Sequence, residues 1–231
     1  MKYLAVTAAL VCSLAMAASA GPIDSKTVAP LAPDYATGIY VGPEGGFNFY
    51  QALPDHNKPG INNKDSNLGG FGGGKLGYEF DLGLFRPAIE ADIFYNGFSG
   101  SWNRVYHGPA QKHRDYEKYS TDSGVFMENE LVHINLGRLQ PYVGAGMGIY
   151  TSDRTTKQRD TNYYSGKLYS AGTFDSTNTS AAWQLISGAD YYINHRMSVF
   201  AEYKFLNYLN TAAPHGRLGQ QLAGVGVRVF F

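Results

Sequence analysis

A run of glycines that ends in a lysine is the part of this sequence most similar to a nucleotide-binding site. Gly69–Lys75 has the spacing of a phosphate-binding loop up to its lysine, and Gly72–Gly77 has the glycine spacing of a dinucleotide fingerprint. Both motifs need a helix after the loop, and the first needs Ser or Thr where Leu76 stands. The residues after the lysine alternate instead between apolar and polar side chains, which is the period of a strand. The sequence therefore predicts no nucleotide site and no cofactor.

Histidines are the other candidates for acid–base or metal chemistry. The chain has six of them: His56, His107, His113, His133, His195 and His215. Nucleophilic hydrolysis needs a serine held by a histidine that an acid orients. Only His133, near Glu130 on an irregular strand, is a candidate for that role, and we favour a strand residue beside a bulge as its interpretation. The acids and histidines of the polar segments lack metal-ligand spacing, so the sequence predicts no catalytic residue and no metal site.

The amino terminus has the features of a secretory signal peptide. Lys2 is followed by the apolar run Leu4–Ala17 and then by Ala18-Ser19-Ala20. A charged start, an apolar stretch too short to span a bilayer and a small-x-small site are typical of such a signal. We predict a signal peptide at 1–20 with cleavage after Ala20. The only cysteine, Cys12, lies inside it, so the mature chain has no thiol for a disulfide or a metal.

Composition favours an all-β protein. The chain is 44% hydrophobic, 14% aromatic and 16% charged, with 28 Gly, 18 Tyr and a formal net charge of zero. Abundant glycine and tyrosine with few charges fit strands better than helices. The absence of net positive charge argues against nucleic acid as a partner. After the signal, no apolar run approaches the ~20 residues that a membrane helix needs.

Alternation of apolar with polar or small residues recurs eight times after residue 38. We predict strands at about 38–49, 70–80, 88–95, 124–136, 142–150, 183–191, 198–205 and 219–231, after a flexible lead-in at 21–37. The connections between them alternate long and short. Pro43 cannot donate to a strand ladder, so we expect a bulge or a local break there. The parity of the fourth strand changes after Leu131, and we expect a bulge near Val132.

The glycines indicate which face of these strands points outward. A soluble, lipocalin-like barrel with an apolar interior would leave an outer wall of glycines that pack against nothing. With the apolar face outward, the same glycines leave room inside a narrow eight-stranded barrel for long charged side chains. Residues 38–231 are therefore predicted to form an eight-stranded antiparallel transmembrane up-and-down β-barrel. Its interior charged network is predicted to comprise Glu44, Lys75, Glu79, Glu90, Asp92, Asp190, Glu202, Lys204 and Arg228.

The closing strand carries a family resemblance. Together with Gly38–Gly42 and Pro141–Gly148, the alternating valines of 219–231 and the final phenylalanine resemble the small OmpA-like and opacity-type outer-membrane β-barrel proteins. The resemblance implies a place in the bacterial outer membrane, with short periplasmic turns and long extracellular loops. It also implies a carboxyl-terminal signal for the barrel-assembly machinery, formed by Val225, Val227, Val229 and Phe231.

In that setting the long polar segments Asn96–Ser123 and Thr151–Thr179 are predicted to be extracellular loops. Their lysines and arginines lie among tyrosines and suit the phosphates of lipopolysaccharide. The candidate contacts are Arg104, Lys112, Arg114, Arg154, Lys157 and Arg159. Acidic residues dilute the positive charge of both segments, so solvated loops without a ligand are the interpretation that we favour.

The functional prediction is a structural barrel of the outer membrane that contributes to envelope integrity or surface interaction and performs no chemistry. A narrow channel is the alternative, in which rearranged interior ion pairs admit water or ions. An enzyme that modifies lipid A is a third hypothesis, and a soluble lipocalin-like binder is a fourth.

Overall fold

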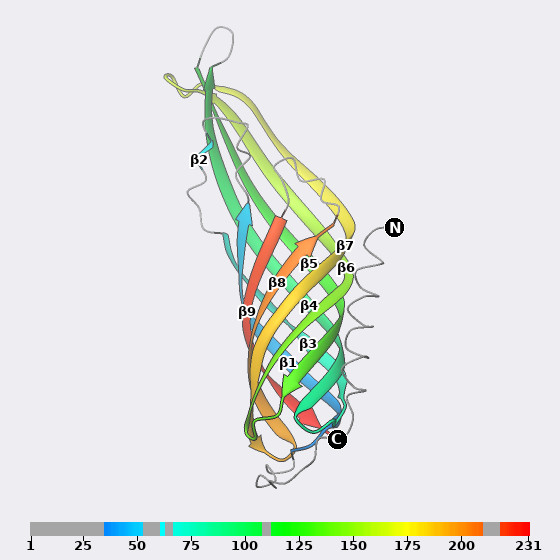
Figure 1. Cartoon of the computed structure of the whole chain (residues 1–231). Coiled ribbons are helices and arrows are strands. Elements are labelled where there is room, and N and C mark those ends of the chain that lie inside the picture. Colours follow the sequence, from blue (N-terminus) through cyan, green and yellow to red (C-terminus); the bar gives the residue numbers. More distant parts are fainter. Residues whose placement is uncertain (1–34, 53–60, 63–66, 108–111, 210–217) are drawn as a thin grey trace. The chain divides into compact units, whose positions relative to one another are not determined.

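The computed structural model describes residues 35–52, 61–62, 67–107, 112–209 and 218–231 (Figure 1). The predicted signal peptide and residues 21–34 of the predicted lead-in lie outside the described residues. The strands are β1 (Gly38–Ala52), β2 (Ile61–Asn62), β3 (Asn67–Glu79), β4 (Phe85–His107), β5 (Lys112–Ile134), β6 (Leu139–Asn162), β7 (Leu168–Asn194), β8 (Met197–Tyr208) and β9 (Leu218–Phe230).

All of these strands except the short β2 close an antiparallel ring. Their order is β4-β3-β1-β9-β8-β7-β6-β5, and β4 pairs with β5 to complete the circle. Apart from β2, which pairs with β4 at Asn103 and Arg104, strands that follow one another in the chain are neighbours in the ring, as in an up-and-down barrel. The predicted eight-stranded antiparallel barrel is therefore confirmed.

Short turns join the strands at one end of the barrel. Gly83 and Gly137 have φ angles of +82° and +86°, which other residues rarely adopt. The backbone N–H of Gly83 donates to Asp81 Oδ1 (3.0 Å), and that of Gly137 donates to Asn135 Oδ1 (3.2 Å). These side chains hold the chain in its turn after each strand ends. This end corresponds to the periplasmic end of outer-membrane barrels, where the turns are short.

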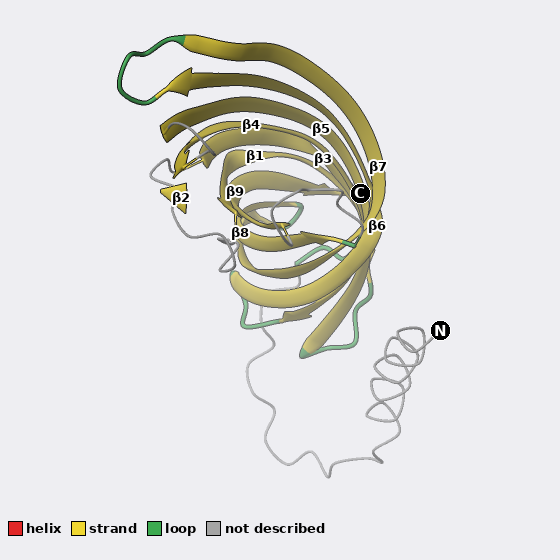
Figure 2. Cartoon of the chain, turned by 90° about the horizontal axis from the view of Figure 1, so that it is seen from above, coloured by secondary structure: helices red, strands yellow, loops and turns green. Residues whose placement is uncertain are grey.

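Four strands continue well past the other end of the ring. β4 runs to His107, β5 begins at Lys112, β6 runs to Asn162 and β7 begins at Leu168. The segments predicted as loops at 96–123 and 151–179 are therefore mostly β-hairpins (Figure 1). Both faces of these hairpins are polar, so they lack the apolar alternation from which strands are read in a sequence. We call residues 98–107, 112–123, 151–162 and 168–181 the projecting sheet. Seen from above, its strands form an open arc (Figure 2).

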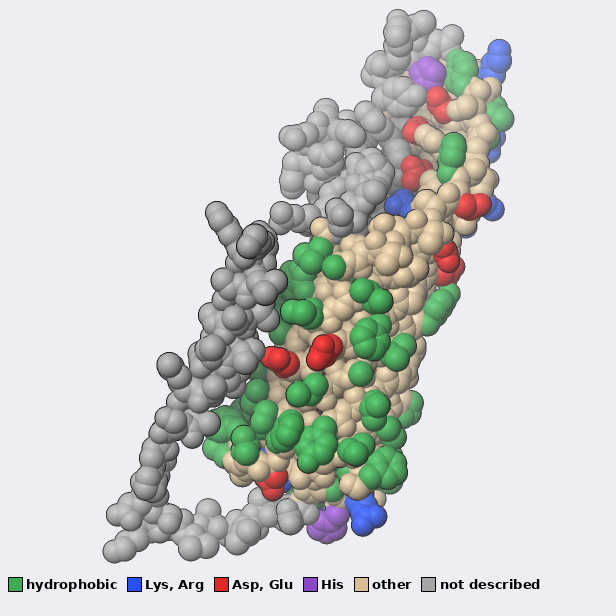
Figure 3. Space-filling view, turned by 90° about the vertical axis from the view of Figure 1, so that its right-hand side faces the viewer, with side chains coloured by type: hydrophobic (Ala, Val, Ile, Leu, Met, Phe, Trp, Pro, Cys, Tyr) green, Lys and Arg blue, Asp and Glu red, His purple; other side chains and the backbone are tan. Residues whose placement is uncertain are grey.

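The outer wall of the barrel is apolar and its interior is polar. Val143 is 62% exposed and Val225 64% exposed on the outer wall, whereas Lys75 and Arg228 are buried inside. Figure 3 shows the resulting band of hydrophobic side chains, with acidic side chains within it. This is the orientation predicted from the glycines, and it suits a barrel surrounded by lipid.

β5 differs from its prediction. It pairs residue for residue with β4 and β6 through Val132, so the expected bulge is absent. Because the parity never changes, Met127 and Leu131 point into the barrel, and Glu128 and Glu130 point out of it.

Glycines on β6 explain why the apolar side chains of β5 fit inside. A Cβ atom at Gly144 would lie 2.4 Å from Leu131 Cδ2, and one at Gly148 would lie 2.9 Å from Met127 Sδ. These side chains occupy the space that the glycines leave. The interior is too narrow for side chains from both strands at the same level.

Pro43 interrupts one ladder without shifting its register. β1 pairs with β3 continuously, including Pro43 opposite Gly74. Its pairing with β9 passes from Val41 to Glu44 and skips Gly42 and Pro43, yet the register is the same on both sides of the gap. The local break was therefore predicted correctly and the bulge was not, because proline removes a donor without adding a residue.

Candidate functional site

A cluster of charged side chains fills the middle of the barrel. Lys75 Nζ lies 2.8 Å from Glu90 Oε1, 3.0 Å from Glu202 Oε1 and 3.5 Å from Glu44 Oε2. These carboxylates come from β1, β4 and β8, so one lysine ties together strands that are not neighbours. The four side chains are at most 1% exposed. A buried charge is tolerated only with such partners.

Lys204 and Arg228 extend this cluster across the interior. Lys204 Nζ lies 2.7 Å from Glu44 Oε1 and 2.6 Å from Asp92 Oδ2. The Arg228 Nη1 atom lies 2.5 Å from Asp190 Oδ2. Each cation thus bridges carboxylates from different strands, and the whole cross-section is linked by ion pairs. Such an arrangement holds the interior in one conformation because separating any pair leaves a charge uncompensated.

Tyrosine hydroxyls complete the coordination of these carboxylates. Tyr40 donates to Glu90 Oε2 (2.9 Å), and Tyr142 donates to Glu202 Oε2 (2.7 Å). The guanidinium of Arg228 also lies over the ring of Phe200, 4.4 Å from its centroid. Hydrogen bonds to ionised groups are stronger than those between neutral groups. The tyrosines therefore add to the stability of the ion pairs.

Nearer the short turns, Glu79 belongs to a separate group that the sequence analysis identified only in part. Arg86 Nη1 lies 3.6 Å from Glu79 Oε1, and His133 Nε2 lies 3.4 Å from Asp190 Oδ2. Arg86 was missed because it precedes the clear alternation of its strand. Its position two residues before Ala88, on the inward parity, was the available signal.

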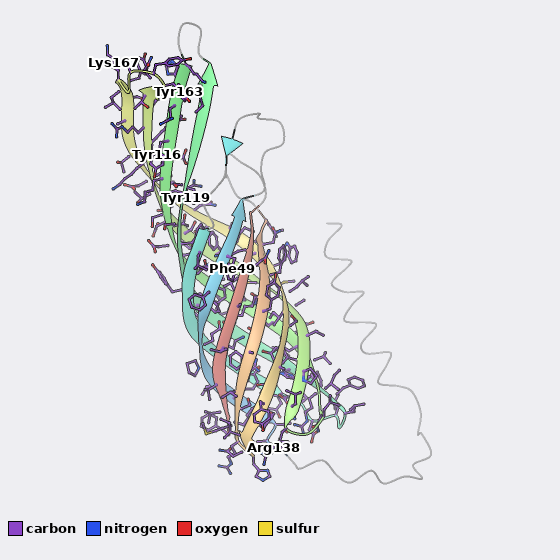
Figure 4. The ribbon with its side chains drawn as sticks, turned by 90° about the vertical axis from the view of Figure 1, so that its left-hand side faces the viewer. Phe49, Tyr116, Tyr119, Arg138, Tyr163 and Lys167 are labelled. Carbon is purple, nitrogen blue, oxygen red and sulfur yellow. The ribbon has the colours of Figure 1, made fainter. Side chains whose placement is uncertain are left out.

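The periplasmic end is covered by the last residues of the predicted lead-in. Tyr35 is buried against Tyr192, with ring centroids 4.6 Å apart, and the N–H of Ala36 donates to the His195 carbonyl (2.8 Å). Arg138, seen at this end in Figure 4, lies beside Tyr35 in the turn after β5. Hydrogen bonding to tyrosine hydroxyls raises the pKa of the Arg138 guanidinium above its ordinary value. Residues 35–37 thus pack on the barrel.

Above the ion pairs lies a layer of amides. Asn96 Nδ2 donates to Gln220 Oε1 (2.8 Å), and Gln184 Nε2 donates to Asn129 Oδ1 (2.6 Å). Asn48 donates to Asn96 Oδ1 as well. Each of these side chains is fully buried. Together the two layers occupy the interior with side chains from every part of the ring.

The candidate lipopolysaccharide contacts lie on different faces of the projecting sheet. We call the face that continues the lipid-facing wall the outer face, and the opposite face the inner face. Arg114, Lys157 and Arg159 are exposed on the outer face, and Lys112 Nζ lies 4.1 Å from the Tyr163 ring centroid near the same tip. Arg154 lies on the inner face, 3.4 Å from Glu117 Oε1. Arg104 lies on β4 opposite Asp115.

Acidic residues of the projecting sheet mostly share the inner face. Asp115, Glu117 and Asp160 have the inward parity of β5 and β6. The outer face has Lys118 directly opposite Lys157 instead. The sequence places both signs in one segment, but the pleat of the strands separates them. The positive charge of the outer face is therefore less diluted than the sequence suggests.

Chemistry-bearing groups in the described residues form no metal site, because no group of three His, Asp or Glu side chains there has the required arrangement. His133 Nδ1 lies 3.3 Å from the Arg86 carbonyl oxygen inside the barrel. His56 and His215 lie outside the described residues.

Comparisons with known proteins agree with this architecture. The Neisserial surface protein A structure is 17% identical, with a TM-score of 0.41, over 84% of this chain and 98% of that one. The amino-terminal barrel of OprF from Pseudomonas aeruginosa is 17% identical, with a TM-score of 0.37, over 82% and 96%. Ail of Yersinia pestis is 9% identical, with a TM-score of 0.31, over 84% and 99%. Comparison with curated protein sequences gives no match.

A helix long and apolar enough to cross a membrane is not found in the described part of the chain. The family described as outer membrane protein beta-barrel domain matches residues 5–231. The chain therefore belongs to this family of β-barrels of the bacterial outer membrane.

Proposed function

We propose that this protein is a structural barrel that contributes to envelope integrity and holds its projecting sheet at the cell surface for interaction. The observation that supports this role is the interior, where Lys75, Lys204 and Arg228 each bridge several carboxylates. Passage of ions requires these pairs to separate, which is costly in a low-dielectric interior. The barrel then serves as a rigid membrane anchor.

Conductance of the full chain in a planar lipid bilayer tests the proposal. A structural barrel gives no discrete current steps, because the paired interior holds no continuous water path. Insertion is verified on the same preparation by heat-modifiable gel migration, which is typical of a folded barrel. Regular steps from a preparation that has passed this check would contradict the proposal.

A narrow channel is the second candidate. The observation that favours it is a set of buried atoms without a hydrogen-bond partner among the described residues, including Asp92 Oδ1, Gln184 Oε1 and Gln220 Nε2. Such atoms mark positions where water satisfies polar groups. Under this hypothesis the current steps disappear in the double variant Glu202→Gln/Lys204→Met, which removes the charges that an ion would meet.

We also propose that the barrel performs no chemistry on lipid A. The support is the position of His133, whose ring is held inside the barrel against Asp190 and Arg86 and away from the lipid-facing wall. Mass spectrometry of lipid A from cells with and without the protein tests this point. A changed spectrum would show that the protein modifies lipid A.

Lipopolysaccharide phosphates remain a proposed ligand of the cations on the projecting sheet. Arg114, Lys157 and Arg159 support the proposal because they are exposed on its outer face. Replacing all three with alanine is expected to lower the lipopolysaccharide that copurifies with the barrel, and phosphate analysis measures it. Arg154→Ala on the inner face is the matched control.

The barrel-assembly machinery is a proposed partner during biogenesis. Val225, Val227, Val229 and Phe231 share the outward face of the closing strand. The N–H of Phe231 also donates to the Ile39 carbonyl (3.0 Å). Deleting Phe231 is expected to lower the yield of heat-modifiable barrel in cells, and an unchanged yield would contradict the proposal.

A further inference from the structure

One edge of the projecting sheet has no partner strand. β7 pairs with β8 only from Ala182 onward, and the N–H of Leu209 donates to the Ala181 carbonyl (2.9 Å). Among the described residues, Leu168–Ser180 pairs with β6 alone. Figure 2 shows β7 at the border of the open arc. Backbone N–H and C=O groups along this border are therefore available to an added strand.

The sequence of this edge does nothing to block such pairing. Edge strands are usually protected by proline, lysine or a bulge that turns them away. Leu168–Ser180 contains no proline, lysine or arginine, and its only charge is Asp175. Thr155 Oγ1 donates to Asp175 Oδ1 (2.8 Å), so this carboxylate is held against β6. The one register shift of the pair, between Asp160 and Thr161, lies at the tip of the hairpin.

Charge on the outer face specifies what the added strand carries there. Lys157 and Arg159 on β6 lie opposite Thr173 and Ala171 of the edge, whose short side chains leave the cations uncovered. A strand beside β7 would be two strand spacings, about 9.6 Å, from these cations. The long side chains of lysine and arginine reach acidic side chains across that distance.

No described residue neutralises these cations. Neither Lys157 nor Arg159 forms an ion pair with a carboxylate among the described residues. Lys157 faces Lys118 directly across β5 and β6, and like charges in that position destabilise a sheet. An acidic partner removes this unfavourable interaction.

The inner face of the same edge is apolar. Phe174 is 60% exposed, and a Cβ atom at Gly172 would lie 3.1 Å from its ring. The ring therefore lies flat over the glycine and presents a hydrophobic surface at the edge. Successive residues of an added strand alternate between the two faces, so its acidic residues meet the outer face and its apolar residues meet Phe174.

We propose that the edge of β7 at Leu168–Ser180 binds an extended polypeptide segment in which acidic and apolar residues alternate. Backbone hydrogen bonds supply the pairing, and the alternation of side chains supplies the selectivity. The inference rests on the proposed surface role and identifies the class of partner for it.

A synthetic peptide tests the edge pairing. The probe is a labelled peptide of about ten residues with alternating Glu and Val, added to the full chain in lipid nanodiscs and followed by fluorescence anisotropy. The matched peptide is N-methylated at every second residue, which keeps its charge and removes half of its backbone donors. Loss of several hydrogen bonds is expected to weaken binding roughly tenfold or more. Equal affinity of the two peptides would overturn the proposal.

Charge reversal in the protein tests the selectivity. Lys157→Glu/Arg159→Glu is expected to weaken binding of the acidic peptide roughly tenfold and to strengthen binding of a Lys-Val peptide. Lys167→Glu, at the exposed tip of the same hairpin (Figure 4), is the control and is expected to leave both affinities within about twofold. Equal effects of the two charge changes would overturn the proposal.

Other occupants of the edge give different results. Dextran sulfate that displaces the peptide and binds equally well to a variant with Thr173→Pro would indicate a polyanion instead of a strand. Dimers in analytical ultracentrifugation that Thr173→Pro abolishes would indicate a second copy of the chain. Either result overturns the proposed partner. Current steps in the bilayer assay overturn the structural role alone, because peptide binding is measured independently of conductance.

Discussion

At the scale of single residues, the buried cations are the most sensitive positions of the barrel. Lys75→Met is expected to lower the free energy of unfolding by about 3–5 kcal/mol, because Glu90 and Glu202 lose the ammonium group that both contact. Urea unfolding in lipid vesicles, followed by the loss of heat-modifiable migration, measures the change. Lys167→Met, at an exposed position, is the control and should leave stability unaltered. A loss for Lys75→Met no larger than that of the control would show that water compensates the carboxylates.

Glycines of the barrel wall separate into two groups by the space around them. A Cβ atom at Gly42 would lie 2.0 Å from the Val227 backbone oxygen, whereas one at Gly72 would lie 3.8 Å from the Glu44 backbone oxygen. Gly42→Ala is therefore expected to destabilise the barrel by about 1–3 kcal/mol, because the neighbouring backbone must shift. Gly72→Ala is expected to be neutral or slightly stabilising. The same urea titration measures both, and equal effects would contradict the steric explanation.

At the scale of elements, β5 carries two acidic residues on the lipid-facing wall. Glu128 lies between Ala91 and Met147, and Glu130 lies between Ile89 and Ala145. Charged groups on this face of a barrel are unfavourable near the middle of the bilayer. Glu128→Leu/Glu130→Leu is expected to stabilise the barrel by at least about 1 kcal/mol in vesicles.

An inward-facing acid of the neighbouring strand gives the matched control for this prediction. Glu90→Leu removes a partner of Lys75 and Arg228, and the same assay should report destabilisation. If both leucine variants shift stability in the same direction, the assigned orientation of β5 is wrong.

The same strand shows why parity alone does not determine orientation. In β5 apolar and polar residues alternate as well as in β6, and the apolar set of 125–131 matched the lipid-facing sets of the other strands. Its true direction depends on Gly144 and Gly148 of β6, which leave interior space for Leu131 and Met127. That space exists only once the two strands are in register, so the residues of β5 alone do not specify it.

At the scale of the whole molecule, the barrel and the projecting sheet are separable. The interior ion pairs lie below the sheet, among residues 44–92 and 190–228. Replacing 99–120 and 154–178 with Asn-Gly turns is therefore expected to leave a heat-modifiable barrel of nearly the same stability. The trimmed barrel should lose binding of the acidic peptide. Failure of the trimmed chain to migrate as a folded barrel would show that the sheet is needed for closure.

The sequence by itself determined the number of strands, their antiparallel order and the polar interior, because period two and the spacing of short turns are local properties. It also placed Lys75, Glu90, Lys204 and Arg228 on the inward face of their strands. Which carboxylate each cation contacts was decided only by ring closure, which brings β3, β8 and β9 around one axis. Ring closure also fixed the direction of β5. The projecting sheet and its free edge on β7 likewise emerged only from pairing, since strands with two solvated faces lack a hydrophobic period.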